Sequence, residues 1–476
     1  MRRAEPYDVA IVGAGSAGCA LAGRLAAKTD LRIALVEAGP DYGPRSGGGW
    51  PADVVDAHHS PDSHDWGLEQ SRARVVGGCS AHNECAIVRA LPGDYDRWRL
   101  PGWSDADLAS VAYDVASALP HYVCHDDDLT TWQRAFLDAA VDAGIPRLAN
   151  ADAAPGTPGV APFVQNIANG VRWNAAFAFL DPVRSRVDVV GNFLADRLIL
   201  DGDRARALVG RGRRGEAEIR AKRFVLCTGV YGSPTILLRS GVGPRDDLAA
   251  LRIPTHADLP GVGANLHDHP GVGLEYEPTT RAHRAVKRED ADGRFYEVQL
   301  VLRTAPDLHV VPYQARDASD WSFGIITFYL DPRSRGRVRL TSRAPDATPA
   351  IDLGFLSDSD DHDVGALVEG MRVIHDLTKR SPLAKVIKRG PRRFSSDARV
   401  AQYVRENVSD YGHSVGTCRM GPSPSAGDVV DVRGRVHGLA NVFVADASII
   451  PRIPRANTNL TCSVIGARVA DVLPSG

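Results

Sequence analysis

The clearest hydrophobic pattern lies near the start of the chain. Residues 8–12 form a short apolar run that leads into a glycine-rich turn, and helix-forming residues follow from 19 to 26. A second strand-like run, 32–36, closes with Glu37. The turn has the spacing G-x-G-x-x-G, formed by Gly13, Gly15 and Gly18.

This order is typical of the strand–helix–strand unit that binds the ADP group of a dinucleotide. Gly13 allows a tight turn, Gly15 lets backbone N–H groups approach a pyrophosphate, and Gly18 lets the helix pack closely on the strand. Glu37 can accept hydrogen bonds from ribose hydroxyls. The pattern therefore predicts an ADP-binding site near the N-terminus.

A second match to the same spacing, 210–215, lies between two alternating runs, 205–209 and 217–220. No apolar helix follows it, and no acidic residue stands at the right distance. Alternation with a period of two is typical of strands, so this match predicts a hairpin turn.

The rest of the chain mixes helical and strand-like patterns. The run 224–229 enters a helix at 234–239 and predicts a return to the parallel sheet of the first unit, whereas strand-like, aromatic-rich segments from 271 to about 353 predict a separate antiparallel layer. Further patterns indicate loops at 39–74 and 150–170, helices at 94–143, 172–180 and 364–377, a strand at 442–445 and a final helix from 457 to about 473.

Composition narrows the function further. The 476 residues carry a net charge of -2, which gives no reason to expect nucleic acid as a partner. No apolar stretch is long enough to span a membrane, and the N-terminus lacks a signal-peptide core, so a cytoplasmic location is expected. Seven scattered cysteines without a C-x-x-C motif predict neither disulfides nor a metal site.

Together these blocks resemble the glucose-methanol-choline (GMC) family of FAD-dependent oxidoreductases from residue 7 to about 473. The resemblance implies an α/β fold: a Rossmann-like FAD-binding domain and a discontinuous substrate domain, of α+β type, built on an antiparallel sheet. The expected FAD-binding domain comprises 1–155, 185–270 and 415–476, and the substrate-binding domain comprises 156–184 and 271–414. The motifs that carry the resemblance are the first glycine turn with Glu37, 77–80, 229–244, 261–269, and the segments around His413 and Asn457.

The resemblance also implies which residues contact FAD. Within the family, the segment 77–83 is most similar to choline oxidase and its relatives, in which the histidine at the position of His82 is bonded to the flavin. We therefore predict a covalent bond from His82 to FAD; the alternative is a histidine that packs beside the ring. The other expected FAD contacts are Gly13, Gly15, Ser16, Ala17, Gly18, Glu37, Ala38, Trp66, Arg74, Val76, Gly77, Gly78, Cys79, Ser80, Asn83, Ala195, Gly412, Asp446, Ala447, Thr458 and Asn459.

His413 and Asn457 are the expected catalytic residues. Oxidation of an alcohol requires its hydroxyl proton to leave, and an imidazole with an ordinary pKa near 6.5 is suited to accept it. Asn457 can position the substrate oxygen without adding charge. His267 and His269 form an H-x-H pattern that could suggest a metal, but no third ligand is near in sequence, and a loop at the domain boundary is the favoured interpretation.

The predicted activity is oxidation of a small alcohol to an aldehyde or ketone, with oxygen or another carrier accepting the electrons. A carbon–carbon lyase of the hydroxynitrile kind, with structural FAD and the same histidine, is the alternative. A pyridine-nucleotide reductase is disfavoured because it needs a second glycine turn and a redox C-x-x-C. Choline is disfavoured as the substrate because Gly271 replaces the carboxylate expected after the Asp-His-Pro block. The sequence predicts neither the alcohol nor the oligomeric state.

Overall fold

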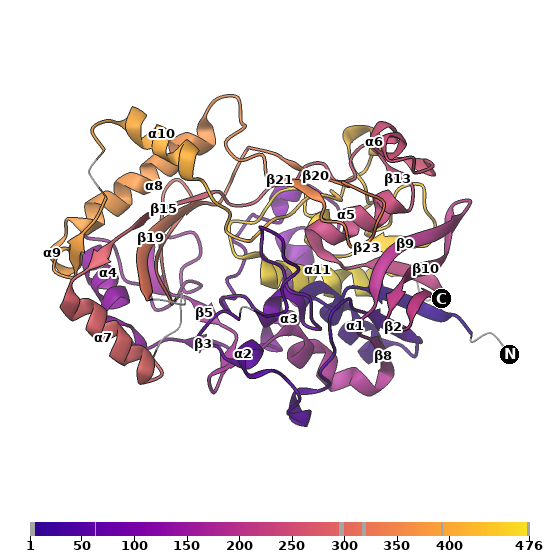
Figure 1. The fold of residues 1–476 in the computed structure, drawn as a ribbon, viewed down its shortest axis with the longest axis horizontal. Helices are drawn as coiled ribbons and strands as arrows, with labels where there is room; N and C mark the ends of the chain where they lie inside the picture. Colours follow the sequence, from indigo (N-terminus) through magenta and orange to yellow (C-terminus); the bar gives the residue numbers. More distant parts are fainter. Residues whose placement is uncertain (1–4, 62, 295–298, 317–319, 392–393, 474–476) are drawn as a thin grey trace.

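The computed structural model of the chain describes residues 5–61, 63–294, 299–316, 320–391 and 394–473. Two sheets lie at opposite ends of the molecule, and both chain termini are at the end that holds the parallel sheet (Figure 1).

The first sheet is parallel and collects strands from the whole length of the chain. Its order is β23 (Val442–Val444), β12 (Ala221–Leu226), β1 (Tyr7–Val12), β2 (Ile33–Val36) and β8 (Val187–Val190). The pairing of β12 with β1 confirms the predicted return of the chain to this sheet. Because the carboxyl ends of parallel strands meet at one edge, the segments that follow Val12, Val36, Leu226 and Val444 come together there.

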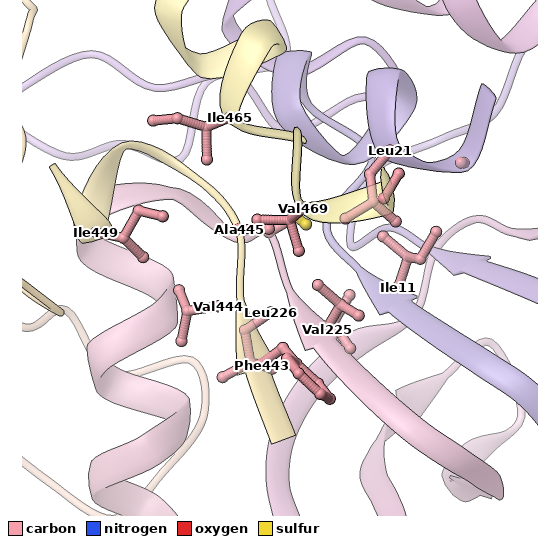
Figure 2. Close-up of a cluster of buried hydrophobic side chains, with 14 of the residues drawn as sticks. Ile11, Leu21, Val225, Leu226, Phe443, Val444, Ala445, Ile449, Ile465 and Val469 are labelled. Carbon is pink, nitrogen blue, oxygen red and sulfur yellow. The ribbon is translucent and has the colours of Figure 1, made fainter. Parts of the chain in front are cut away.

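Two helices cover this sheet and carry its buried core. α1 (Ser16–Lys28) follows β1 directly, and α11 (Thr458–Val472) ends the chain and packs along α1. Figure 2 shows Leu21 of α1, Ile465 and Val469 of α11 and strand residues such as Val225 and Phe443 in one apolar cluster. The last helix is thereby held against the first.

The second sheet is antiparallel, with the order β15 (Gly271–Glu275), β19 (Trp321–Tyr329), β18 (Leu308–Arg316), β17 (Leu300–Thr304) and β4 (Gly159–Pro162). One face carries Leu302, Val310 and Ile325, which pack against helices. The other face carries Val301, Val311 and Phe328, which pack with Ala456 just before α11. The helices at this end are α4 (Thr131–Asp142), α7 (Thr280–Ala291), α8 (His362–Thr378), α9 (Ser381–Ala384) and α10 (Asp397–Asn407) (Figure 1).

A third, smaller sheet confirms the predicted hairpin. β10 (Arg204–Gly212) and β11 (Gly215–Ile219) pair antiparallel across a tight turn, and β9 (Leu194–Asp201) flanks β10. The second G-x-G-x-x-G match is therefore strand and turn. The remaining helices and strands are α2 (Ala52–Val55), α3 (Asp105–Ser117), α5 (Gly229–Arg239), α6 (Arg245–Ala250), β3 (Tyr122–Val123), β5 (Val164–Gln165), β6 (Ile167–Ala168), β7 (Val171–Arg172), β13 (Val242–Gly243), β14 (Ala257–Asp258), β16 (Glu277–Pro278), β20 (Arg337–Arg339), β21 (Ala350–Asp352) and β22 (Ile387–Arg389).

The packing bears on the expected domain boundaries in two places. α4 was expected in the first domain, but its residues Phe136 and Ala139 pack with the antiparallel sheet. Residues 176–180 were expected in the second domain, but they pack on α1. The division into two domains stays a proposal. By its packing, α4 belongs with the antiparallel sheet, and residues 176–180 belong with the parallel sheet.

Close contact between α1 and α11 generates the first prediction. A Cβ atom added to Gly466 would lie 2.1 Å from the carbonyl oxygen of Ala17, so Gly466→Ala must push the helices apart. We expect a loss of about 1–3 kcal/mol in the free energy of unfolding, measured by urea denaturation. The control is Gly365→Ala in α8, where an added Cβ meets nothing within 4 Å, and this change should be neutral or stabilising. Equal stability of the two variants would contradict a tight helix contact.

Candidate active site

The glycine turn after β1 has the geometry that its sequence predicts. Gly13 has φ +102°, and a Cβ atom on Gly18 would lie 1.9 Å from the Gly13 carbonyl oxygen, so turn and helix are in direct contact. Among the described residues, no side chain caps the N-terminus of α1, and its first turn contains no acidic residue. Ala17 and Gly18 there are buried. Buried, uncapped N–H groups at a helix N-terminus attract anions, and this arrangement fits a pyrophosphate.

Glu37 lies at the end of β2, where the sequence predicts a ribose acceptor. Its carboxylate accepts hydrogen bonds from the backbone N–H groups of Ala14 (3.0 Å) and Gly39 (2.9 Å). Burial raises the pKa of Glu37, while these two bonds act in the opposite direction. A carboxylate has about four acceptor positions, so Glu37 can hold the turn and still accept a hydroxyl.

The loop 77–83 lies directly on this turn. The Gly77 N–H donates to the Ala14 carbonyl (2.7 Å). A Cβ atom on Gly78 would lie only 2.5 Å from the Gly15 Cα, so the two backbones approach as closely as glycine permits. Ser80 fixes the loop by donating to the Gly77 carbonyl and accepting from the Ala175 N–H.

His82 and Cys79 form the reactive end of this loop. The His82 Nε2 atom is buried and has no hydrogen-bond partner among the described residues. Burial acts to raise the pKa of the Cys79 thiol, but the hydrogen bond from His82 and the charge of Arg72 outweigh it and lower the pKa. A buried, unpartnered imidazole nitrogen beside a phosphate-binding turn fits attachment or hydrogen bonding to a flavin ring.

The C-terminal half supplies a pair of histidines with defined protonation. His269 is fully buried, and its Nε2 lies 3.1 Å from the Pro454 carbonyl, which can only accept. His269 Nε2 therefore carries the proton, and its Nδ1 accepts from His413 Nδ1 at 3.1 Å. His413 is then left with a lone pair on Nε2.

Asn457 completes this chain of hydrogen bonds. Its Nδ2 amide group donates to His413 Nε2 at 3.1 Å, and its Oδ1 is buried without a partner among the described residues. Burial, followed by the influence of His269 and Arg72, lowers the pKa of His413 well below its usual value. His413 is therefore neutral and presents a basic nitrogen beside an amide that can also bond an oxygen.

Asp268 fixes the backbone around this pair. Its carboxylate accepts from the N–H groups of His269 (2.7 Å) and His413 (3.0 Å) and from the Ser414 hydroxyl (2.7 Å). Burial and the nearby Asp410 raise the pKa of Asp268 to about 6. The spacing of His413 from His269 is thus set by one shared carboxylate.

Two contacts join the N-terminal and C-terminal halves. The Ser16 hydroxyl at the start of α1 donates to Asn459 Oδ1 at the start of α11, at 2.6 Å. Asp446, buried after β23, accepts from the Gly229 N–H and the Ser233 hydroxyl of α5. The neighbouring Ala447 carbonyl accepts from the Gly416 N–H. The glycine turn and the histidine pair are therefore parts of one site.

The aromatic face of the antiparallel sheet closes the site. Tyr411 stacks on Phe328 with ring centroids 3.6 Å apart and lies 4.2 Å from the His413 ring. Tyr411 therefore lies between the His413 ring and Phe328 of β19.

Some of the expected cofactor contacts lie outside this cluster. Trp66 is 39% exposed and stacks with Arg74, whose guanidinium also approaches the Ala38 carbonyl. Asn83 uses its Oδ1 to accept the Cys85 N–H. The remaining expected contacts lie in backbone segments around the site: Val76 is buried beside Pro40, Ala195 is on β9, Gly412 is exposed with φ +78°, and Thr458 opens α11.

Sequence reasoning missed the role of His269. The H-x-H pattern indicates either a metal ligand or a loop residue. Neither interpretation predicts that His269 orients the ring of His413 through a hydrogen bond. His267 has the structural role instead: its Nδ1 donates to the Asn265 carbonyl, and its Nε2 accepts from the Ile453 N–H. Both nitrogens of His267 are occupied, which leaves none for a metal.

The chain is similar to known proteins over nearly its whole length. GMC oxidoreductase family models match residues 7–271 and 332–466. The chain is 29% identical to oxygen-dependent choline dehydrogenase 1 of Chromohalobacter salexigens, over 99% of this chain and 95% of the relative. It is also 29% identical to 5-(hydroxymethyl)furfural oxidase of Methylovorus sp., over 98% of each. The crystal structure of pyridoxine 4-oxidase from Mesorbium loti aligns with a TM-score of 0.86 at 27% identity, covering 98% of each chain. In the described ranges, no helix is both long and apolar enough to cross a membrane.

The buried histidines predict how stability depends on pH. Burial lowers the pKa of His267 well below 6.5, so in the unfolded chain this residue binds a proton that it does not bind in the folded protein. Stability must then fall as the pH drops below about 6.5, by up to about 1.4 kcal/mol per pH unit for each such group. We expect His267→Gln to reduce the slope of unfolding free energy against pH between 6.5 and 5, measured by urea denaturation.

The exposed His121 provides the matched control, because its side chain meets water in both states. His121→Gln should leave the slope unchanged. Asp268, whose pKa is raised, takes up at most one proton in the folded protein as the pH falls, and this uptake changes stability in the opposite direction to the histidines. Because Asp268 is present in both variants, the difference between their slopes is due to His267. An unchanged slope in His267→Gln would show that this histidine is charged when folded.

Proposed function

The chain belongs to the GMC oxidoreductase family, and we propose that His413 and Asn457 carry out its acid–base chemistry. Its relatives establish an FAD-dependent enzyme that oxidises an alcohol to an aldehyde or ketone, and they favour this activity over a lyase. The observation that supports the assignment is the lone pair on His413 Nε2, which accepts a hydrogen bond from the Asn457 amide in this structure.

We propose that the substrate hydroxyl binds next to His413 Nε2 and the Asn457 side chain and takes the place of the direct hydrogen bond between them. His413 Nε2 accepts the hydroxyl proton, and the Asn457 amide N–H bonds the oxygen as negative charge develops on it. His269 keeps the His413 ring in the tautomer that has its lone pair toward the substrate. FAD bound at this site would supply the hydride acceptor for the substrate carbon.

Two loops on the parallel sheet would hold the cofactor. The N-terminus of α1 and the Gly77–Gly78 backbone would hold the pyrophosphate end, Glu37 the ribose, and His82 with the start of α11 the flavin end. The final electron acceptor is oxygen or another carrier, and the names of the relatives, which include an oxidase and an oxygen-dependent dehydrogenase, favour oxygen. The cytoplasmic location stays a prediction from the sequence.

The catalytic assignment is tested by His413→Gln. Loss of the general base should lower kcat/KM for alcohols by about 10²- to 10⁴-fold while FAD remains bound, measured by stopped-flow flavin reduction and by the flavin spectrum. The control is His437→Gln, because His437 bonds only the Gly421 carbonyl away from the site, and full activity is expected. A His413→Gln enzyme with undiminished turnover would exclude this role.

We further propose that a covalent bond joins an imidazole nitrogen of His82 to the 8α carbon of the flavin. The buried, unpartnered Nε2 supports it. Acid precipitation of purified protein should leave the yellow colour in the wild-type pellet and release it to the supernatant from His82→Ala. His64→Ala is the control, because His64 bonds Tyr42 outside the loop. Release of flavin from the wild-type protein would leave His82 as a residue that only packs beside the ring.

A further inference from the structure

The substrate-facing side of the antiparallel sheet carries an unusual buried cation. Arg303 of β17 is paired across the strands with His309 of β18, which is paired in turn with Phe328 of β19. Residues paired in this way share one face of the sheet. Phe328 stacks on Tyr411, which adjoins His413, so this face is directed toward the catalytic histidine.

The guanidinium of Arg303 is only partly satisfied. Arg303 is 8% exposed; its Nε donates to His309 Nε2 (3.2 Å) and its Nη1 donates to the Ala151 carbonyl (3.2 Å). Its Nη2 is buried without a hydrogen-bond partner, and no carboxylate of the described residues lies within ion-pair distance. Asp152 and Asp94 act on Arg303 by charge at longer range, and both have other partners: Asp152 accepts from the Arg89 N–H, and Asp94 pairs with Arg97 and Arg455. A buried positive charge left unpaired is costly, so its presence calls for an anion.

His309 adds a second donor. It is fully buried, and because its Nε2 accepts from Arg303, the proton of the neutral ring must be on Nδ1. That Nδ1 atom is buried and has no partner in the described part of the chain. Burial and the charge of Arg303 lower the pKa of His309 well below its usual value, which is consistent with this neutral form.

Further unpaired polar groups lie close by. The Tyr411 hydroxyl and both polar side-chain atoms of Gln299 are buried without partners among the described residues. Gln299 immediately precedes β17. Gln299, Val301 and Arg303 are every second residue of this segment, so their side chains lie on the same face of the sheet. The Tyr411 hydroxyl lies next to the Asn457 side chain and also near the charge of Arg303, and the Tyr411 ring is edge-on to His309 at 6.3 Å between centroids. Native proteins rarely leave so many buried polar groups unpaired in one region unless a ligand or ordered water completes them.

We propose that the substrate is an alcohol that also bears a carboxylate, and that Arg303 and His309 bind this carboxylate while His413 acts on the hydroxyl. The inference rests on the proposed function of His413. One positive charge matches a monoanion, and Arg303 Nη2 and His309 Nδ1 are unpartnered N–H donors for its oxygens. Glu84, the acid that also lies near Tyr411, accepts the Ser60 hydroxyl at 2.5 Å. The hydroxyl end is oxidised as described above, and the carboxylate end is unchanged.

The test compares alcohols that differ only in charge. Holoenzyme is mixed anaerobically with ω-hydroxycarboxylates of increasing chain length, with 4-(hydroxymethyl)benzoate, and with the neutral alcohols of matching size. The choline cation serves as a probe of opposite charge. We expect the best carboxylate to reduce the flavin with a kcat/KM at least about 30-fold above its neutral partner, as befits a charge-assisted contact.

Substitution of the arginine assigns the effect. Arg303→Met should lower the ratio of kcat/KM for carboxylate against neutral alcohol by about 30- to 100-fold, mainly through KM, and Arg303→Lys should restore part of it. Arg316→Met, at the exposed end of β18, is the matched control and should leave the ratio unchanged.

The outcomes separate the two proposals. Wild-type enzyme that reduces its flavin with neutral or cationic alcohols at least as fast as with every carboxylate would overturn the inference and leave the role of His413 intact. An equal loss for both alcohol classes in Arg303→Met would also overturn it, because a structural role lowers both. Failure of every alcohol to reduce the flavin would instead contradict the proposed function. The wild-type comparison decides the matter even where a variant does not fold.

Discussion

The site depends on the contact between the first helix of the chain and the last. α1 begins at the glycine turn and α11 begins beside Asn457, and the two helices approach so closely at Gly466 that no side chain fits between them. The Ser16–Asn459 hydrogen bond fixes the register of their N-termini. A phosphate-binding turn encoded at the start of the sequence is thereby held beside catalytic groups encoded at its end. Any change that separates these helices acts on cofactor binding and on catalysis together.

The direction of the hydrogen bonds from Pro454 to Asn457 is a second constraint. It is set by the Pro454 carbonyl, which lies outside the proposed reacting groups. The Pro454 carbonyl has no proton to give, so each bond that follows it through His269 and His413 to Asn457 has only one possible direction. Burial strengthens this arrangement because it keeps both imidazoles neutral. The proposed role of His413 as a base therefore depends on the residues behind it, and His269 is proposed as a positioning residue that does not touch the substrate.

Much of the fold could be predicted from sequence because its signals are local. The glycine turn, the strand at 221–226 and the hairpin at 204–219 each follow from patterns within about twenty residues. The family resemblance predicts which residues should form the site. It does not predict the hydrogen bonds among them. His269 and Pro454 are far apart in the chain, and the bond between them exists only once both sheets are assembled. Glu37 shows the same limit: its position was predicted, whereas its bonds to two backbone amides depend on the turn around it.

The two sheets divide the chemistry according to what each geometry provides. Parallel strands bring their carboxyl ends to one edge, where glycine-rich loops expose backbone N–H groups that suit phosphates of any nucleotide. Antiparallel strands instead place chosen side chains opposite one another on a face, and Arg303, His309 and Phe328 occupy one such row. Backbone groups cannot distinguish one small alcohol from another, but a row of side chains can. Under the proposed function, selectivity for the substrate resides in the antiparallel sheet, and Arg303 in that row matters more for the choice of alcohol than any residue of the cofactor motif.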